Sequence, residues 1–321
     1  MSWFIGGLIF LILGYFIYGR FVERILRPDD RPTPALAQAD GVDYVPLPKW
    51  KNMLIQLLNI AGVGPVIGVI AGIKFGKVAL LIIPVGCVFM GAVHDFVSGF
   101  ISLRMKGANL PTIVATLLGK VYAAVFSVAL IFLLILMVAV FINIPASLID
   151  RTVFPSVPLF TAMAVAIFVY YIVATLFPVD KIIGAIYPYF GGLLIVGSLA
   201  MCVALVVVGV QSPELLQESP AFLKYRAEVF DAGGRSPLFP LLFVTIACGI
   251  ISGFHATQSP IVARTMRSER EARTTYYGMM IAEGVIAMIW AAAALAMYNK
   301  DPATLYLAPA DVLGRVTTWL L

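Results

Sequence analysis

Four ionisable side chains stand inside apolar runs of this sequence, where each could carry a proton or bind a cation. His94 and Asp95 are adjacent in one run, and His255 and Glu283 stand in two later runs. An ionisable group at membrane depth marks a functional site or belongs to a buried pair. An imidazole next to a carboxylate suits a proton carrier, and it equally suits a hydrogen-bonded strut.

Three alternatives to a coupling site remain open for these groups. Asp95 and Glu283 could instead reach the membrane interface, or they could pair with Arg104 or Arg273. The two carboxylates and the two histidines could also bind a metal ion in an intramembrane metalloenzyme, but no metal-ligand spacing supports this reading. We therefore expect no metal and no cofactor, with H⁺ or Na⁺ as the coupling ion.

Two apolar runs are interrupted by residues that disfavour helix. The run "LNIAGVGPVIGVIAG" contains Gly62, Gly64 and Pro65, and glycine and proline are the poorest helix formers. Their spacing could also serve only close helix packing. The run at 237–262 contains "SGFHATQSP", whose candidate binding residues are Ser252, Gly253, His255, Gln258 and Ser259. Broken helices in transporters present free backbone groups to substrate and ion, so we predict non-helical backbone at 62–65 and 252–260 and a binding site between the two segments.

The elements that must position these groups are membrane helices. Hydrophobic residues make up 61% of the 321 residues and charged residues only 12%, about half the charge of a soluble domain. Eight apolar runs have roughly the length of a bilayer span: 3–19, 53–72, 77–103, 121–142, 158–177, 184–210, 237–262 and 276–298. We expect a ninth helix to begin near 307. The sequence has no basic stripe interleaved with aromatic residues, which argues against nucleic-acid binding.

The distribution of basic residues predicts the orientation. Fourteen of the 22 Lys and Arg residues fall in segments 20–52, 104–120, around 181 and 264–273. Seven fall on the opposite side, six between these segments and Lys300 after the last of them. Cytoplasmic loops carry the excess of basic residues, so we expect 20–52 and 264–273 to be cytoplasmic. The segment 211–236 is then an external loop that contains a short solvated helix.

The two interrupted runs also occupy mirrored positions. With the run at 3–19 set aside, each opens a unit of helices, and the two units have opposite orientations. This pattern predicts an all-α polytopic membrane protein with the LeuT-like inverted-repeat architecture. The expected divisions are an extra helix and cytoplasmic loop (1–52), a first five-helix repeat (53–210), an external loop (211–236) and an incomplete second repeat (237–321).

Five motifs, in order along nearly the whole chain, resemble the carbon starvation protein A family. They are "TPALAQADGVDYVPLPKW" (33–50), "IAGVGPVIG" (60–68), "GAVHDF" (91–96), "SGFHATQSP" (252–260) and "YYGMMIAEG" (276–284). The resemblance implies peptide uptake under carbon starvation, and pyruvate uptake with protons in some members. It also implies a LeuT-like fold of the amino acid–polyamine–organocation superfamily, in the bacterial inner membrane.

The sequence departs from the family pattern in two places. Some members carry paired histidines before the glycine run, where this sequence has Ile55 and Gln56. The family also continues past this point through a Ser-Gly-Asp-Thr motif that is absent here, so we expect a chain truncated after the second helix of the second repeat, completed by a second copy or a missing C-terminal segment. The expected function is secondary active uptake of peptides, with a small-carboxylate (pyruvate) cation symporter or a non-transporting starvation sensor as alternatives.

Overall fold

The computed structural model describes residues 1–62, 64–150, 158–176, 183–231, 247, 250 and 255–321. Within these residues the chain is helical and has no strand. Among the described residues, five helices are long and apolar enough to cross a membrane: Ser2–Leu26, Ala79–Arg104, Lys120–Leu148, Tyr189–Gln211 and Glu269–Lys300. A sixth span is a bent pair, Lys49–Ile60 with Gly64–Phe75, whose halves meet at 51°.

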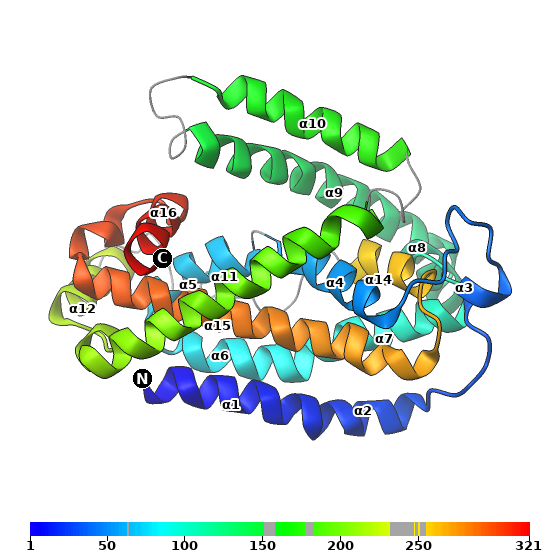
Figure 1. Cartoon of the computed structure of the whole chain (residues 1–321), viewed down its shortest axis with the longest axis horizontal. Helices are drawn as coiled ribbons and strands as arrows, with labels where there is room; N and C mark the ends of the chain where they lie inside the picture. Colours follow the sequence, from blue (N-terminus) through cyan, green and yellow to red (C-terminus); the bar gives the residue numbers. More distant parts are fainter. Residues whose placement is uncertain (63, 151–157, 177–182, 232–246, 248–249, 251–254) are drawn as a thin grey trace.

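Helix α15 (Gly278–Lys300) forms the centre of the bundle (Figure 1). It packs against α1 (Ser2–Phe16), α6 (Ala79–Gly86), α4 (Lys49–Ile60) and α11 (Ile183–Gln211), among others. Small residues permit this close packing, because Ala291 to Ala294 are fully buried and Gly284 lies directly against Cys87. The core is thus formed around a helix that is buried on nearly all sides.

Three π-helical segments adjoin α15. They are η1 (Gly64–Gly68) and η3 (Cys87–Gly91), which pack against α15, and η8 (Arg273–Tyr277), which leads directly into it. The segment η3 joins α6 to α7 (Ala92–Arg104) without a break, so these form one long span. π-Helical turns inside α-helices are rare and occur frequently at functional sites.

Helices α9 (Lys120–Leu148) and α10 (Phe160–Leu176) form a hairpin at the edge of the bundle (Figure 1). The most apolar stretch of α9 has no buried residue. An apolar helix surface that the rest of the described protein leaves unburied suits lipid, because lipid chains are as apolar as a protein core. The expected span at 158–177 is present as the shorter α10.

The remaining elements are connections and ends. They are α2 (Tyr18–Leu26), α3 (Pro34–Ala37), α5 (Val69–Gly72), η2 (Ile73–Phe75), α8 (Leu110–Leu118), η5 (Pro213–Leu216), α12 (Pro220–Arg226), η6 (Ala227–Asp231), α14 (His255–Ala263), η7 (Glu269–Glu271), η9 (Pro302–Tyr306) and α16 (Pro309–Leu320). The short helix expected in 211–236 is present as α12, and the helix expected near 307 is α16. The N-terminal span is longer than expected, because α2 continues α1 to Leu26 after a bend at Ile17.

The predicted breaks differ from the observed ones. The first span does break, but at Ala61 and Gly62, and Gly64 and Pro65 already belong to η1. Proline fits the first turn of a helical segment, where its missing N–H needs no partner.

The prediction for 252–260 was wrong over its described part, because 255–260 are helical in α14. Polar side chains do not unwind a helix when neighbouring helices supply partners for them. The rest of that stretch, with Ser252 and Gly253, lies outside the described residues.

Candidate functional site

Asp95 is the centre of a buried polar cluster where α4, α7 and α14 meet (Figure 1). Its carboxylate is fully buried and accepts two hydrogen bonds. Gln56 Nε2 of α4 donates to Oδ2 at 2.7 Å, and Ser259 Oγ of α14 donates to Oδ1 at 3.1 Å. The same carboxylate therefore joins the broken span to the helix that carries the second polar motif.

A histidine pair extends this cluster. His94 Nδ1 and His255 Nδ1 are 3.0 Å apart, and their rings stack with centroids 5.2 Å apart. One ring must donate and the other accept, so the pair cannot keep this contact when both imidazoles are cationic. His255 is buried and His94 is exposed, so the pair reaches from the interior to the surface of the molecule.

Helices α4 and α14 run antiparallel past each other. Asn52 Nδ2 of α4 donates to the carbonyl of Thr265, just after α14, at 3.1 Å. In return, Thr265 Oγ1 donates to Asn52 Oδ1 at 2.7 Å. One turn later, Gln56 is linked through Asp95 to Ser259, which precedes Thr265. The chain numbers rise along one helix as they fall along the other, as predicted for the two interrupted segments.

Tyr276 of η8 closes the cluster from the side of α15. Its hydroxyl donates to the carbonyl of Ser259 at 3.0 Å, and the whole side chain is buried. The ring lies against Gly99 of α7, where an added Cβ would come within 2.5 Å of it. A glycine is therefore required for this ring to reach α14.

Glu283 of α15 is fully buried, and neither of its carboxyl oxygens has a hydrogen-bond partner within the described residues. The next residue, Gly284, lies against Cys87 of η3, and α15 packs against α7, which carries Asp95. The alternative in which Arg104 or Arg273 pairs with the intramembrane acids is wrong, because Arg104 pairs with Glu269 at 2.9 Å and Arg273 with Glu23 at 2.9 Å.

The structure brings some of the predicted site residues together and leaves others apart. The structure brings Asp95, Ser259 and the two histidines together. Gln258 is buried in α14, and its Nε2 has no partner among the described residues. Gly62, Gly64 and Pro65 lie at the break after α4, and no hydrogen bond between described residues links them to Asp95. Their role in binding stays a prediction.

The described residues contain no group of three or more His, Cys, Asp or Glu side chains arranged to hold a metal ion.

Sequence reasoning missed Gln56 and Tyr276 of the cluster. It also missed Asn52, which lies one turn before Gln56 on the same helix. The signal was present, because two polar side chains four residues apart occupy one face of an otherwise apolar helix. Their burial shows that this face is turned into the bundle.

Within the described parts of the chain, basic side chains of the larger set, including Arg104, Arg264 and Arg270, hold one end of the bundle together. At this end the segment 27–48 is tied to α7 and to the segment after α14. Arg104 donates to both oxygens of the buried Glu269, at 3.2 and 2.9 Å, and Arg270 pairs with Asp30 at 2.6 Å. Hydrogen bonds from Arg31 hold the pKa of Asp29, at this same end, well below its usual range.

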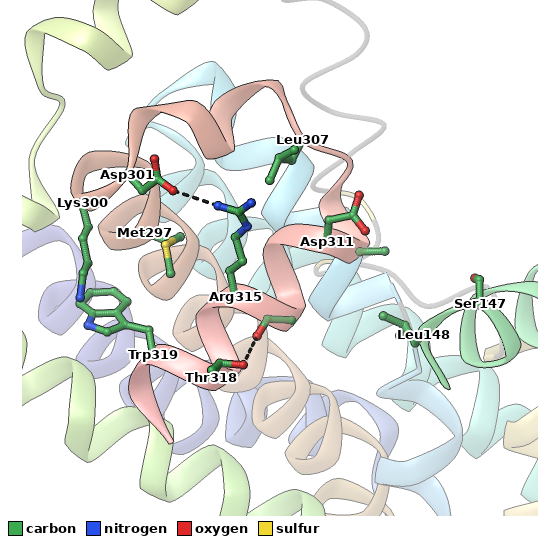
Figure 2. A pocket seen from close by; sticks show the side chains of 12 residues that line it. Ser147, Leu148, Met297, Lys300, Asp301, Leu307, Asp311, Arg315, Thr318 and Trp319 are labelled. Atoms are coloured by element: carbon green, nitrogen blue, oxygen red, sulfur yellow. Dashed lines mark hydrogen bonds and ion pairs between the residues drawn. The ribbon is translucent and has the colours of Figure 1, made fainter. Parts of the chain in front are cut away.

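A charged pocket of about 730 Å³ opens at the opposite end (Figure 2). Arg315 of α16 pairs with Asp301 at 3.0 Å, and the Lys300 ammonium lies 4.2 Å from the centre of the Trp319 ring. Leu307 lines the same pocket, and its carbonyl accepts a hydrogen bond from Lys74 of the bent span at 2.9 Å. This pocket contains none of the predicted site residues.

The fold and the cluster define a polytopic helical membrane protein with an ionisable centre between its helices. A family model described as carbon starvation protein CstA matches residues 1–168 and 158–318. The chain belongs to this family. No solved structure matches the chain.

Three relatives illustrate the range of the family. The chain is 41% identical to an uncharacterized membrane protein of Haemophilus influenzae, over 94% of this chain and 93% of that protein. It is 31% identical to the peptide transporter CstA of Campylobacter jejuni, over 87% of this chain and 47% of that protein. It is 28% identical to the pyruvate/proton symporter BtsT of Escherichia coli, over 87% of this chain and 46% of that protein. The chain therefore spans about half the length of the relatives that are named as transporters.

Proposed function

We propose that this protein is a secondary active transporter of the bacterial inner membrane that takes up peptides, with proton movement through the Asp95 cluster as the driving reaction. The observation that carries the proposal is the buried Asp95 carboxylate, held by one donor from the broken span and one from α14. A charge this far from water is costly, so a group that must gain and lose it is expected at a coupling site.

The geometry supports the LeuT-like inverted repeat as the architecture of the transporter. The two segments that open the predicted units are antiparallel and meet at Asp95. A carboxylate that bonds to both can respond when one unit rocks against the other, because alternating access moves one repeat relative to its mate. The break after α4 and the π-helical segment η1 that follows it supply irregular backbone in the span that carries Gln56.

The names of the relatives and the charged pocket support the substrate class. Relatives are named as a peptide transporter and as a pyruvate/proton symporter. The pocket presents Lys300, Arg315, Asp301 and Asp311 around one opening (Figure 2). Charges of both signs suit a zwitterionic peptide better than a simple carboxylate, so peptide is the first candidate and pyruvate the second.

Uptake into proteoliposomes tests the proposal. The purified chain is reconstituted, and labelled dipeptide or labelled pyruvate is offered under an inward proton gradient, an inward sodium gradient or no gradient. We expect dipeptide to accumulate under the proton gradient and an excess of unlabelled dipeptide to abolish the signal. Saturable dipeptide binding with no uptake under any gradient would favour the starvation sensor, and uptake driven only by sodium would refute the proton as coupling ion.

A further inference from the structure

Glu283 is a buried acid that the Asp95 cluster does not use. Both of its carboxyl oxygens lack a hydrogen-bond partner within the described residues, and the side chain has no exposed surface. Cys87 of η3 lies against the adjacent Gly284, and α7, which carries Asp95, packs against α15. A buried carboxyl group that has no donor or cation among the described residues is stabilised by holding a proton.

Asp95 has the opposite surroundings. Two donors, Gln56 Nε2 and Ser259 Oγ, point at its two oxygens and stabilise the ionised form. The two carboxyl groups are carried by helices that pack against each other, α7 and α15, and neighbouring carboxyl groups disfavour a state in which both are charged. The surroundings thus divide the roles, with the negative charge placed on Asp95 and the proton on Glu283.

We propose that Glu283 and Asp95 share one exchangeable proton, which Glu283 holds at rest and passes to Asp95 during the transport cycle. This inference rests on the proposed function and adds a second carboxyl group to it. In the transfer the O–H bond of Glu283 breaks and an O–H bond forms on Asp95. The negative charge moves to Glu283, and no further reactant is needed.

The segment η3 provides a physical means for the exchange. It contains Cys87, which lies against Gly284, and it leads directly into α7, which carries Asp95. A π-helical turn holds an extra residue, and one residue corresponds to about 100° of rotation in an α-helix. Rewinding η3 would therefore turn Asp95 relative to Glu283, while the Gly284 contact keeps Cys87 next to α15.

Infrared spectroscopy of the purified chain, compared between wild type and variants, tests the proposal, because a protonated carboxyl group has its own C=O stretching band. At neutral pH we expect this band in the wild type, in Asp95→Asn and in the control Met280→Leu, which changes a buried neighbour one turn away on α15. We expect Glu283→Gln to lose it. A band that persists in Glu283→Gln, or one that only Asp95→Asn removes, would overturn the proposal.

Labelling the wild type avoids dependence on a variant that does not fold. Protein grown with glutamate carrying ¹³C in its side-chain carboxyl should show the band shifted, and protein with ¹³C-labelled aspartate should not. The opposite pattern places the proton on an aspartate and refutes the proposal.

The spectroscopic result is independent of transport. If the wild type accumulates no substrate while the band behaves as expected, the proposed function fails and the proton on Glu283 stands. If uptake is proton-driven but the band persists in Glu283→Gln, only the present inference fails. In a working transporter Glu283→Gln should retain exchange of labelled for unlabelled dipeptide, and its gradient-driven accumulation should fall at least tenfold.

Discussion

Replacing Asp95 by alanine tests whether its carboxylate holds α4 against α14. The substitution removes the oxygens that accept hydrogen bonds from Gln56 Nε2 at 2.7 Å and from Ser259 Oγ at 3.1 Å. Both donors lie in the buried core, where water cannot replace the lost acceptor. A buried polar group left without its partner costs about 1–3 kcal/mol, so Asp95→Ala should lower the free energy of unfolding by about 2–6 kcal/mol.

Asp95→Asn is the informative comparison because it keeps the shape of the side chain. The carbonyl oxygen of the introduced amide can accept from Ser259. Gln56 Oε1 is buried and has no hydrogen-bond partner among the described residues, so turning over the Gln56 amide lets this oxygen accept from the new NH₂ group. The new bonds are weaker than charge-assisted ones, but no charge is buried, and we expect the free energy of unfolding to stay within about 1 kcal/mol of wild type.

The assay is reversible unfolding in mixed detergent micelles, titrated with SDS and followed by tryptophan fluorescence. Ser98→Ala is the matched control, since Ser98 Oγ donates to the backbone carbonyl of Asp95 at 3.2 Å and leaves the carboxylate untouched. We expect a loss of no more than about 1 kcal/mol there. If Asp95→Ala proved as stable as Asp95→Asn, the two hydrogen bonds would not join the helices and the geometry of the cluster would be refuted.

Three further predictions concern the ends of the bundle. Arg104→Met removes two hydrogen bonds from the buried Glu269 and should lower the free energy of unfolding by about 3 kcal/mol; a loss no larger than that of the exposed Arg24→Met would contradict this. Because Arg31 lowers the pKa of Asp29, Asp29 stabilises the folded state above its unfolded pKa of about 3.9, and this contribution is lost as the pH falls toward the lower folded pKa. The pH dependences of unfolding for wild type and Asp29→Asn should therefore converge below about pH 4, and curves that stay parallel would count against the ion pair. In a chain cleared of native cysteines, Glu214→Cys should react with an impermeant maleimide on intact cells and Arg24→Cys only after lysis, whereas the reverse pattern would invert the topology.

Hydropathy predicted the helices well but could not show which of them are buried. Helices α9 and α15 both lie in strongly apolar spans, yet the most apolar stretch of α9 has no buried residue while that of α15 is 78% buried. Lipid and protein core are equally apolar. Small residues such as Ala291 and Gly284 mark the buried helix, because they permit close packing, and this signal is weaker than hydropathy.

The candidate site was predicted in its residues and only partly in its geometry. Asp95, His255 and Ser259 were recognisable as polar groups at membrane depth, and the structure brings them together. The role of Gln56 could not be predicted, since its partner is 39 residues away and depends on how α4 is rotated against α7. The helical state of His255 was missed because local polarity was given more weight than partners on neighbouring helices.

The most direct test of the central claim compares gradient-driven accumulation with exchange in proteoliposomes of wild type and Asp95→Asn. If Asp95 couples proton movement to uptake, the wild type accumulates dipeptide above the external concentration under an inward proton gradient. Asp95→Asn should then fail to accumulate it while still exchanging labelled for unlabelled dipeptide across the membrane. Accumulation by Asp95→Asn equal to that of the wild type would contradict the account.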